Sequence, residues 1–192
     1  MAGAQALPSS LTDPTIHVTA HNAEGKAIVH SSHKNDWSWY RNNSVGFNVV
    51  YTNTFPADLN NLADVKAHEA ITAKGTLGLV NPNGTVCRIV DFGPTSTGST
   101  PLMHRTQSLD FGIVLEGEID MELDDGSVTR LQKGDIAIQR GTMHAWRNPS
   151  EQKWTRMLFV LQDCQPMEVG GERLKEDLGS SEDIPRSGND QN

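Results

Sequence analysis

The stretch MHRTQSLDFGIVLEGE, residues 103–118, decides the expected fold of this chain. It places His104 six residues before Asp110, and an apolar run then ends close to Gly117. A run rich in β-branched residues that stops at a glycine is typical of a strand followed by a turn. The stretch therefore raises one question. His104 and Asp110 are either two ligands of one metal ion or a surface histidine and a turn aspartate.

Short apolar runs separated by turn signals lie on both sides of this stretch. The expected strands are residues 85–92, 113–115, 119–123, 127–131, 135–138 and 154–161. An Asp-Asp-Gly turn at residues 124–126 joins two of them into a hairpin. Residues 57–71 carry apolar side chains at helical spacing and predict one short helix. Many short strands joined by tight turns predict an all-β fold, a single small sandwich or barrel.

The composition sets the number of domains and excludes some partners. A chain of 192 residues is long enough for one hydrophobic core and short for two domains. The net charge is -8 and no run of lysine or arginine is present, so a nucleic-acid partner is not expected. Residues 1–14 and 171–192 are polar, which predicts flexible tails around a domain of residues 15–170.

The sequence also indicates a compartment. No stretch approaches the roughly 18 apolar residues of a membrane helix, and the first residues lack the features of a signal peptide. Cys87 and Cys164 have neither disulfide-framework nor zinc-site spacing, and are expected as thiols in a reducing environment. We therefore expect a cytoplasmic protein with no membrane partner.

The alternation of side chains along strands brings the polar candidates together. In a barrel, inward-facing residues alternate along each strand. His104 and Thr106 then share one face, Asp110 and Gly112 can share the inner face of the next strand, and one cavity can also receive His144. Two imidazoles and one carboxylate on adjacent strands form a facial set for a divalent metal, with open positions for water, oxygen or substrate.

Two stretches, residues 98–117 and 134–148, resemble the two motifs of the cupin superfamily. The residues that match the first motif are Gly98, His104, Thr106, Asp110 and Gly117. In this motif Thr106 stands where a second histidine is usual, and Asp110 where a glutamate is usual. The stretch GDIAIQRGTMHAWRN, residues 134–148, resembles the second motif and has Gln139 at the usual proline position. The two motifs in this order, separated by a hairpin, indicate the cupin fold.

The resemblance extends beyond the motifs, over about residues 15–175. Stretches such as HNAEGKAIVHS, DVKAHE and NGTVCRIVDF are similar to the small single-domain cupins of fungal polyketide gene clusters, which are often described as cupin-domain oxidoreductases. This likeness implies a double-stranded β-helix, or jelly roll, with its motif-bearing core at about residues 85–162. It also implies tailoring of a small secondary metabolite, and a homodimer formed through an exchanged edge strand.

The pattern and the resemblance together give a candidate site. The expected metal ligands and catalytic residues are His104, Asp110 and His144, and the expected pocket residues are Thr106, Gly112, Gln139 and Trp146. Asp110 is one methylene shorter than glutamate, so it can instead orient a histidine or act as a base. We expect a mononuclear divalent metal, iron first, with zinc, manganese or a metal-free site as alternatives. His68 is expected on the surface, as a possible lid residue.

Three functions are compatible with these residues. The first is metal-dependent oxidation of a small hydroxylated or aromatic substrate. The second is acid/base chemistry with zinc or no metal, such as dehydration, decarboxylation or cyclisation of a polyketide intermediate. The third is a binding module that holds a small ligand without converting it. The two histidines at motif positions favour an enzyme over the binding module.

Overall fold

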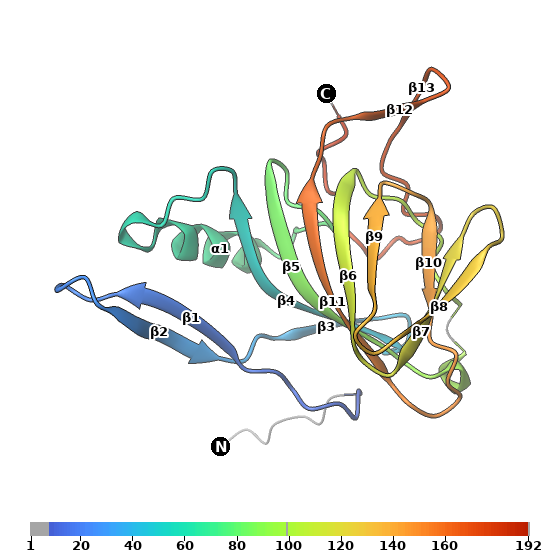
Figure 1. Cartoon of the computed structure of the whole chain (residues 1–192), viewed down its shortest axis with the longest axis horizontal. Helices are drawn as coiled ribbons and strands as arrows, with labels where there is room; N and C mark the ends of the chain where they lie inside the picture. The colour runs from blue at the N-terminus through green and yellow to red at the C-terminus, as the bar shows by residue number, and fades with distance from the viewer. Residues whose placement is uncertain (1–7, 99, 192) are drawn as a thin grey trace.

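The computed structural model describes residues 8–98 and 100–191, and its main feature is an antiparallel sheet of six strands (Figure 1). In spatial order these strands are β3 (Trp37–Tyr40), β4 (Val45–Thr54), β5 (Gly84–Phe92), β11 (Thr155–Asp163), β6 (Ser108–Glu116) and β9 (Ile136–Arg140). A second sheet has the order β10 (His144–Arg147), β7 (Glu118–Leu123) and β8 (Val128–Gln132). Facing each other, the two sheets form the expected jelly-roll barrel.

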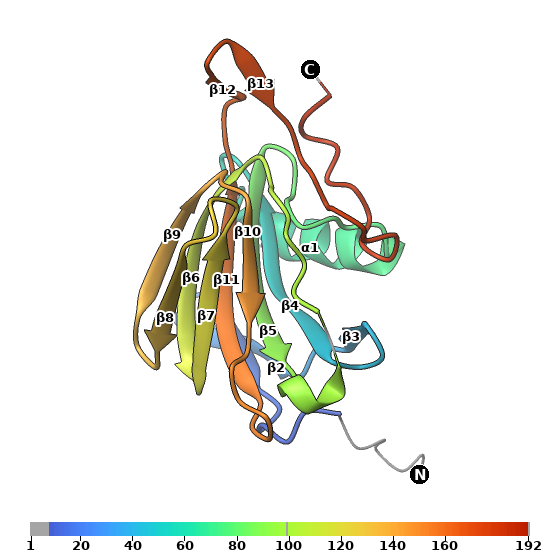
Figure 2. The ribbon, with the colours of Figure 1, turned by 90° about the vertical axis from the view of Figure 1, so that its right-hand side faces the viewer.

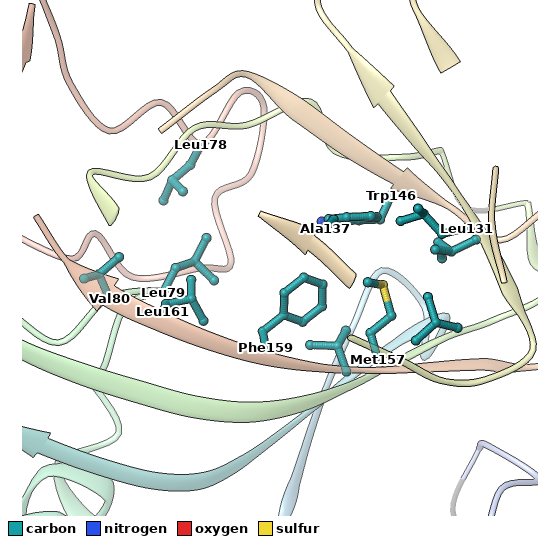
Figure 3. Packing of buried hydrophobic residues seen from close by; sticks show 12 residues of the cluster. Leu79, Val80, Leu131, Ala137, Trp146, Met157, Phe159, Leu161 and Leu178 are labelled. Atoms are coloured by element: carbon teal, nitrogen blue, oxygen red, sulfur yellow. The ribbon is translucent and has the colours of Figure 1, made fainter. Parts of the chain in front are cut away.

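The core lies between the two sheets. Alternation along β11 buries Met157, Phe159 and Leu161 on its inner face. Figure 3 shows Met157 and Phe159 on one side of the core and, opposite them, Trp146 of β10 and Leu131 of β8. Burying each large apolar side chain contributes about 1.5–3 kcal/mol. This packing holds the sheets at a fixed separation and so defines the space between them.

The expected strands lie where the structure has strands, but the strand expected at residues 113–115 was too short. The β7–β8 hairpin forms as expected, and Gly126 in its turn adopts a left-handed φ of 85°. β6 begins at Ser108, five residues before the expected strand of residues 113–115. Because Ser108 and Asp110 are polar but face inward, the apolar pattern did not reveal the first half of β6.

The expected helix is present, but it begins and ends later in the chain than predicted. α1 spans Ala63–Lys74, after a 3-10 turn, η1, at Asn60–Leu62, whereas residues 57–71 were expected. Gly75 ends α1 with a left-handed φ of 64°, a conformation that glycine adopts without strain. A second 3-10 turn, η2, spans Thr95–Thr97.

His68 lies on the inner side of α1, so its expected surface position was wrong. Its ring is buried against β4, with a centroid 4.6 Å from that of Tyr51. Its Nδ1 lies 3.0 Å from Thr52 Oγ1. The side chain was misjudged because its burial depends on the docking of α1 onto β4, which a single histidine in a sequence does not reveal.

The C-terminal segment packs on the barrel, although its composition predicted a tail. Leu178 is 3% exposed and joins the core at the end opposite Leu131 (Figure 3). Ser187 donates a hydrogen bond to the buried carboxylate of Glu176 and accepts one of 3.0 Å from the Val80 amide. Ser187 thus links this segment to Glu176 within it and to Val80 of the core. Residues 1–7 of the expected N-terminal tail lie outside the described residues.

Two hairpins extend from the barrel. β1 (Ile16–His21) and β2 (Ala27–His33) project to one side in Figure 1, and most of their residues are exposed. β12 (Met167–Val169) and β13 (Glu172–Leu174) rise from one end of the barrel, where the C-terminal segment descends beside α1 (Figure 2). In the described part of the chain, no helix has the length and apolar character needed to cross a membrane.

Candidate functional site

A pair of histidines joins the two sheets at one end of the barrel. The backbones of His104 and His144 form an antiparallel bridge with two N–H to O hydrogen bonds of 2.9 Å each. His104 precedes β6 and His144 begins β10, so the bridge connects the large sheet to the small one. The two ring centroids lie 4.4 Å apart. Residues forty positions apart in the sequence therefore meet, as the alternation argument predicted.

The hydrogen bonds of the two rings determine which ring nitrogen is free. His104 Nδ1 lies 3.0 Å from the Leu102 carbonyl oxygen, and His144 Nδ1 lies 2.9 Å from the Thr142 carbonyl oxygen. A carbonyl oxygen only accepts, so each Nδ1 carries the proton and donates it. In the neutral ring, Nε2 then holds the lone pair. Both rings have this arrangement, which is the one that metal-binding histidines commonly use.

Asp110 is held by a short chain of hydroxyl groups. Thr106 Oγ1 donates to Asp110 Oδ2 at 3.4 Å, and Ser108 Oγ donates to Thr106 Oγ1 at 2.7 Å. The other carboxylate oxygen, Oδ1, is buried and has no hydrogen-bond partner in the described residues. Because a buried polar atom without a partner is costly, this oxygen is a candidate for contact with a ligand.

The three expected metal ligands are only partly grouped. Among residues 8–98 and 100–191, no three His, Cys, Asp or Glu side chains lie close enough together to hold a metal ion. His104 and His144 meet, and Asp110 lines the same cavity without joining them as a third ligand. The donor chemistry still suits a divalent ion, with two imidazole lone pairs and one buried carboxylate oxygen that lacks a partner.

The cavity beside the histidine pair has an empty volume of about 990 Å³, part of which is open to solvent. His104, His144, Asp110 and Trp146 all line it, together with apolar side chains of the large sheet and of the segments beside it. The Trp146 ring meets the His144 ring edge to face, with centroids 5.6 Å apart. Its mostly apolar lining with a few polar groups suits a small organic molecule.

Three of the expected pocket residues support the wall rather than line it. Thr106 lies behind Asp110, to which it donates. Gly112 provides close packing, because a Cβ there would meet the Phe159 ring at 3.0 Å. Gln139 donates to Met121 Sδ at 2.8 Å and accepts a hydrogen bond from Thr142. Strand alternation correctly predicted that these residues face inward. It did not predict that other side chains, and not these, line the cavity.

Burial sets the charge of the site. It lowers the pKa of His144 to about 3, and the neighbouring His104 acts in the same direction. Burial also lowers the pKa of His104, so both rings are neutral near pH 7. For Asp110, burial raises the pKa to about 6, against the hydrogen bonds from Ser108 and Thr106 that favour the charged form. The site thus holds two neutral bases and a carboxyl group that titrates close to neutrality.

One residue in the cavity wall was not singled out from the sequence. Arg88 lies in β5, a strand that is otherwise mostly apolar, and its side chain is buried in the wall that faces the histidines. In cross-strand register it lies beside Phe159, which in turn lies beside Gly112. A lone arginine inside an apolar strand pattern is a signal that could have identified it, since such a charge is rarely buried unless it is paired.

Similar proteins were found among fungal biosynthetic gene products. The cupin domain model matches residues 88–161. Phomopsin biosynthesis cluster protein D of Diaporthe leptostromiformis is 39% identical over 166 residues, which cover 85% of this chain and 86% of that protein. The cupin-domain-containing oxidoreductase srdB of Neurospora crassa is 35% identical over 171 residues, which cover 88% and 83% of the two chains. This chain belongs to the cupin family.

Further similar proteins were found among fungal gene products and solved structures. Oryzines biosynthesis cluster protein J of Aspergillus oryzae is 36% identical over 170 residues, which cover 86% of this cupin and 93% of that protein. Among solved structures, the polyketide cyclase RemF of Streptomyces resistomycificus matches with a TM-score of 0.44 and 18% identity, over 79% of this chain and 84% of that chain. The cupin-2 protein Rru_A2000 of Rhodospirillum rubrum also gives a TM-score of 0.44 and 18% identity, over 76% and 75%.

Proposed function

We propose that this cupin is a tailoring oxidoreductase of fungal secondary metabolism, with a mononuclear divalent metal held by His104 and His144. The observation that carries the proposal is the pairing of two neutral imidazoles whose free Nε2 atoms belong to one cavity. Further support comes from relatives with 35% to 36% identity that are named cupin-domain-containing oxidoreductases. Iron is the preferred metal in this proposal, because imidazole nitrogen is a suitable ligand for iron.

The metal, when bound, would supply redox chemistry and a site at which a substrate hydroxyl or carbonyl is polarised. The protein would contribute the geometry. The Leu102 and Thr142 carbonyl groups fix the rotation of the two rings. The backbone bridge between His104 and His144 then fixes the distance between the rings.

Asp110 would act as the proton acceptor of the site. Its buried Oδ1 is free, and its pKa of about 6 lets the carboxyl group both take up and release a proton near neutral pH. Thr106 holds the other oxygen and so orients the free one. The mostly apolar walls lower the local dielectric constant, which would strengthen each polar contact with the substrate. Trp146 offers an aromatic surface to the substrate beside His144.

A second candidate is acid/base catalysis without redox chemistry, such as dehydration or cyclisation of a reactive intermediate. It is favoured by the separation of Asp110 from the histidine pair and by the raised pKa of its carboxyl group, about 6, which suits proton transfer near neutral pH. The experiment that distinguishes the two measures turnover of a hydroxylated aromatic substrate with and without oxygen. Oxidation that requires oxygen or another electron acceptor supports the first candidate. Conversion at an equal rate without any acceptor supports the second.

We also propose that the protein is a homodimer. Ile28 and Val29 of the projecting hairpin are 42% and 61% exposed, and on edge strand β9 Ile136 and Ile138 are 60% and 50% exposed. Exposed apolar residues on hairpins and edge strands favour association, because pairing covers both the side chains and the free backbone groups. Exchange of the β1–β2 hairpin between two copies would satisfy both requirements.

A further inference from the structure

Arg88 carries a buried positive charge for which the described part of the chain provides no paired carboxylate. The residue is 4% exposed and lies in the cavity wall. Its Nη2 donates to the carbonyl oxygens of Gly78 and Leu79 at 2.8 and 3.1 Å, and its guanidinium lies 5.1 Å from the centre of the Phe47 ring. All of these partners are neutral.

Part of this guanidinium is left without any partner. Arg88 Nε is buried and makes no hydrogen bond within residues 8–98 and 100–191. In the same residues, no carboxylate oxygen lies within 4.0 Å of an Arg88 nitrogen. Asp110 is near enough to act on Arg88 through space, but it does not form an ion pair with it. A buried donor and a buried charge thus remain uncompensated, which is energetically unfavourable.

A second buried arginine shows how this chain compensates such a charge elsewhere. Arg156 is 8% exposed and forms two hydrogen bonds with the Asp91 carboxylate, at 2.6 and 2.8 Å. The two arginines are similarly buried, and they differ in that Arg156 has a carboxylate from the protein whereas Arg88 faces a cavity. The carboxylate that Arg88 lacks can therefore come from a ligand.

The other two arginines of the cavity are more exposed than Arg88, so water can solvate their charges. Arg41 donates to the Thr100 carbonyl oxygen and lies in the field of Asp183. Arg147 is paired with Glu122 at the cavity rim. Arg88 is thus the cavity arginine whose charge is deeply buried and not matched by an acidic side chain.

We propose that Arg88 binds a carboxylate group of the substrate, so that the cavity selects carboxylic acids with an apolar or aromatic body. The apolar body would contact apolar side chains that line the cavity, among them Phe47, Phe159 and Leu161. A charge-assisted hydrogen bond to a carboxylate is about twice as strong as a neutral one. The dry surroundings of Arg88 strengthen it further. This inference rests on the proposed function in so far as the ligand is the substrate.

The test compares an acid with its neutral amide. Binding of decanoate and decanamide is measured by calorimetry on wild-type protein and on the Arg88→Met, Arg88→Lys and Arg140→Met variants. Arg140 is exposed on β9 and provides the matched control. We expect wild-type protein and Arg140→Met to prefer decanoate by about tenfold or more. Arg88→Met should lose this preference and keep its affinity for decanamide, and Arg88→Lys should retain part of the preference.

The inference is overturned if wild-type protein binds both probes equally, or if Arg88→Met still prefers decanoate. Retained decanamide binding demonstrates that the cavity of Arg88→Met is intact. If Arg88→Met does not fold, the inference is tested by two other results. Wild-type protein should prefer decanoate over decanamide, and Arg88→Lys should retain only part of this preference. His104→Ala tests whether the metal, and not Arg88, binds the carboxylate of decanoate. If His104→Ala loses the preference for decanoate and Arg88→Met keeps it, the inference is contradicted. A protein that selects decanoate through Arg88 but contains no metal contradicts the proposed function alone.

Discussion

The backbones of His104 and His144 exchange two hydrogen bonds of 2.9 Å, and their rings face one cavity with centroids 4.4 Å apart. The geometry of the pair is therefore fixed by the main chain at the junction of two sheets and does not depend on contacts between the side chains. Replacing one histidine by alanine removes its imidazole ring but leaves the backbone hydrogen bonds between the two positions in place. Single substitutions at these positions are for this reason suitable tests of function.

Replacing Thr106 by valine should raise the pKa of Asp110 further above 6. The Thr106 hydroxyl donates to the charged carboxylate and lowers its pKa, whereas burial raises it to about 6. Without the Thr106 hydroxyl, less remains to counteract the effect of burial on the pKa of Asp110. Carbon NMR titration of the Asp110 carboxyl group in chelator-treated protein measures the change. Thr129→Val, on an exposed part of β8, is the control. An unchanged or lower midpoint would show that Thr106 does not stabilise the carboxylate.

Replacing Arg156 by methionine should destabilise the fold by about 3–5 kcal/mol. The substitution keeps most of the side-chain volume but leaves Asp91, which is fully buried, without its partner. Urea unfolding measures the free energy of unfolding for the variant and for the exposed control Arg140→Met. A loss no larger than that of the control would mean that Asp91 finds another partner or becomes neutral at little cost.

The fold should lose stability in acid partly because of His68. Burial lowers the pKa of this histidine below its ordinary value of 6.5, so the unfolded chain binds a proton more readily than the folded chain. Its contribution is therefore complete above pH 6.5 and decreases as the pH falls below that value. Urea unfolding at pH 8 and pH 5 should give a smaller difference for His68→Gln than for wild-type protein or for His30→Ala, which is exposed. Equal differences in all three proteins would contradict the assignment.

Sedimentation at micromolar concentration should give a dimer. Val29→Lys places a charge on the exposed apolar hairpin and should shift the protein towards monomer, whereas Val169→Lys, which is equally exposed on β12, should not. A monomeric wild-type protein would contradict the proposed exchange of hairpins. A dimer that Val29→Lys leaves unchanged would mean that another surface forms the interface.

Local signals in the sequence predicted the fold class and the histidine pair. The β7–β8 hairpin was predictable because its turn, at residues 124–126, and its two strands adjoin along the chain. His104 and His144 were predictable because their motif positions and strand alternation agree. The family resemblance reinforced both predictions.

The remaining features depend on contacts between distant residues. The burial of Leu178 requires a polar segment to fold back onto the barrel, and its composition hides this. Asp110 faces the cavity as expected, but its distance from the histidines depends on the exact path of β6. Arg88 needed the structure, since only there is it evident that its charge lacks an acidic partner whereas that of Arg156 has one.

The most direct test of the account is the metal content of the untagged protein, measured by elemental mass spectrometry. We predict about one divalent ion per chain, preferably iron, in wild-type protein and in the control His30→Ala. His104→Ala and His144→Ala should each lose the ion, and Asp110→Ala should retain more of it than either. Absence of metal from the wild-type protein, or full metal content in both histidine variants, would contradict the claim that this pair holds the catalytic ion.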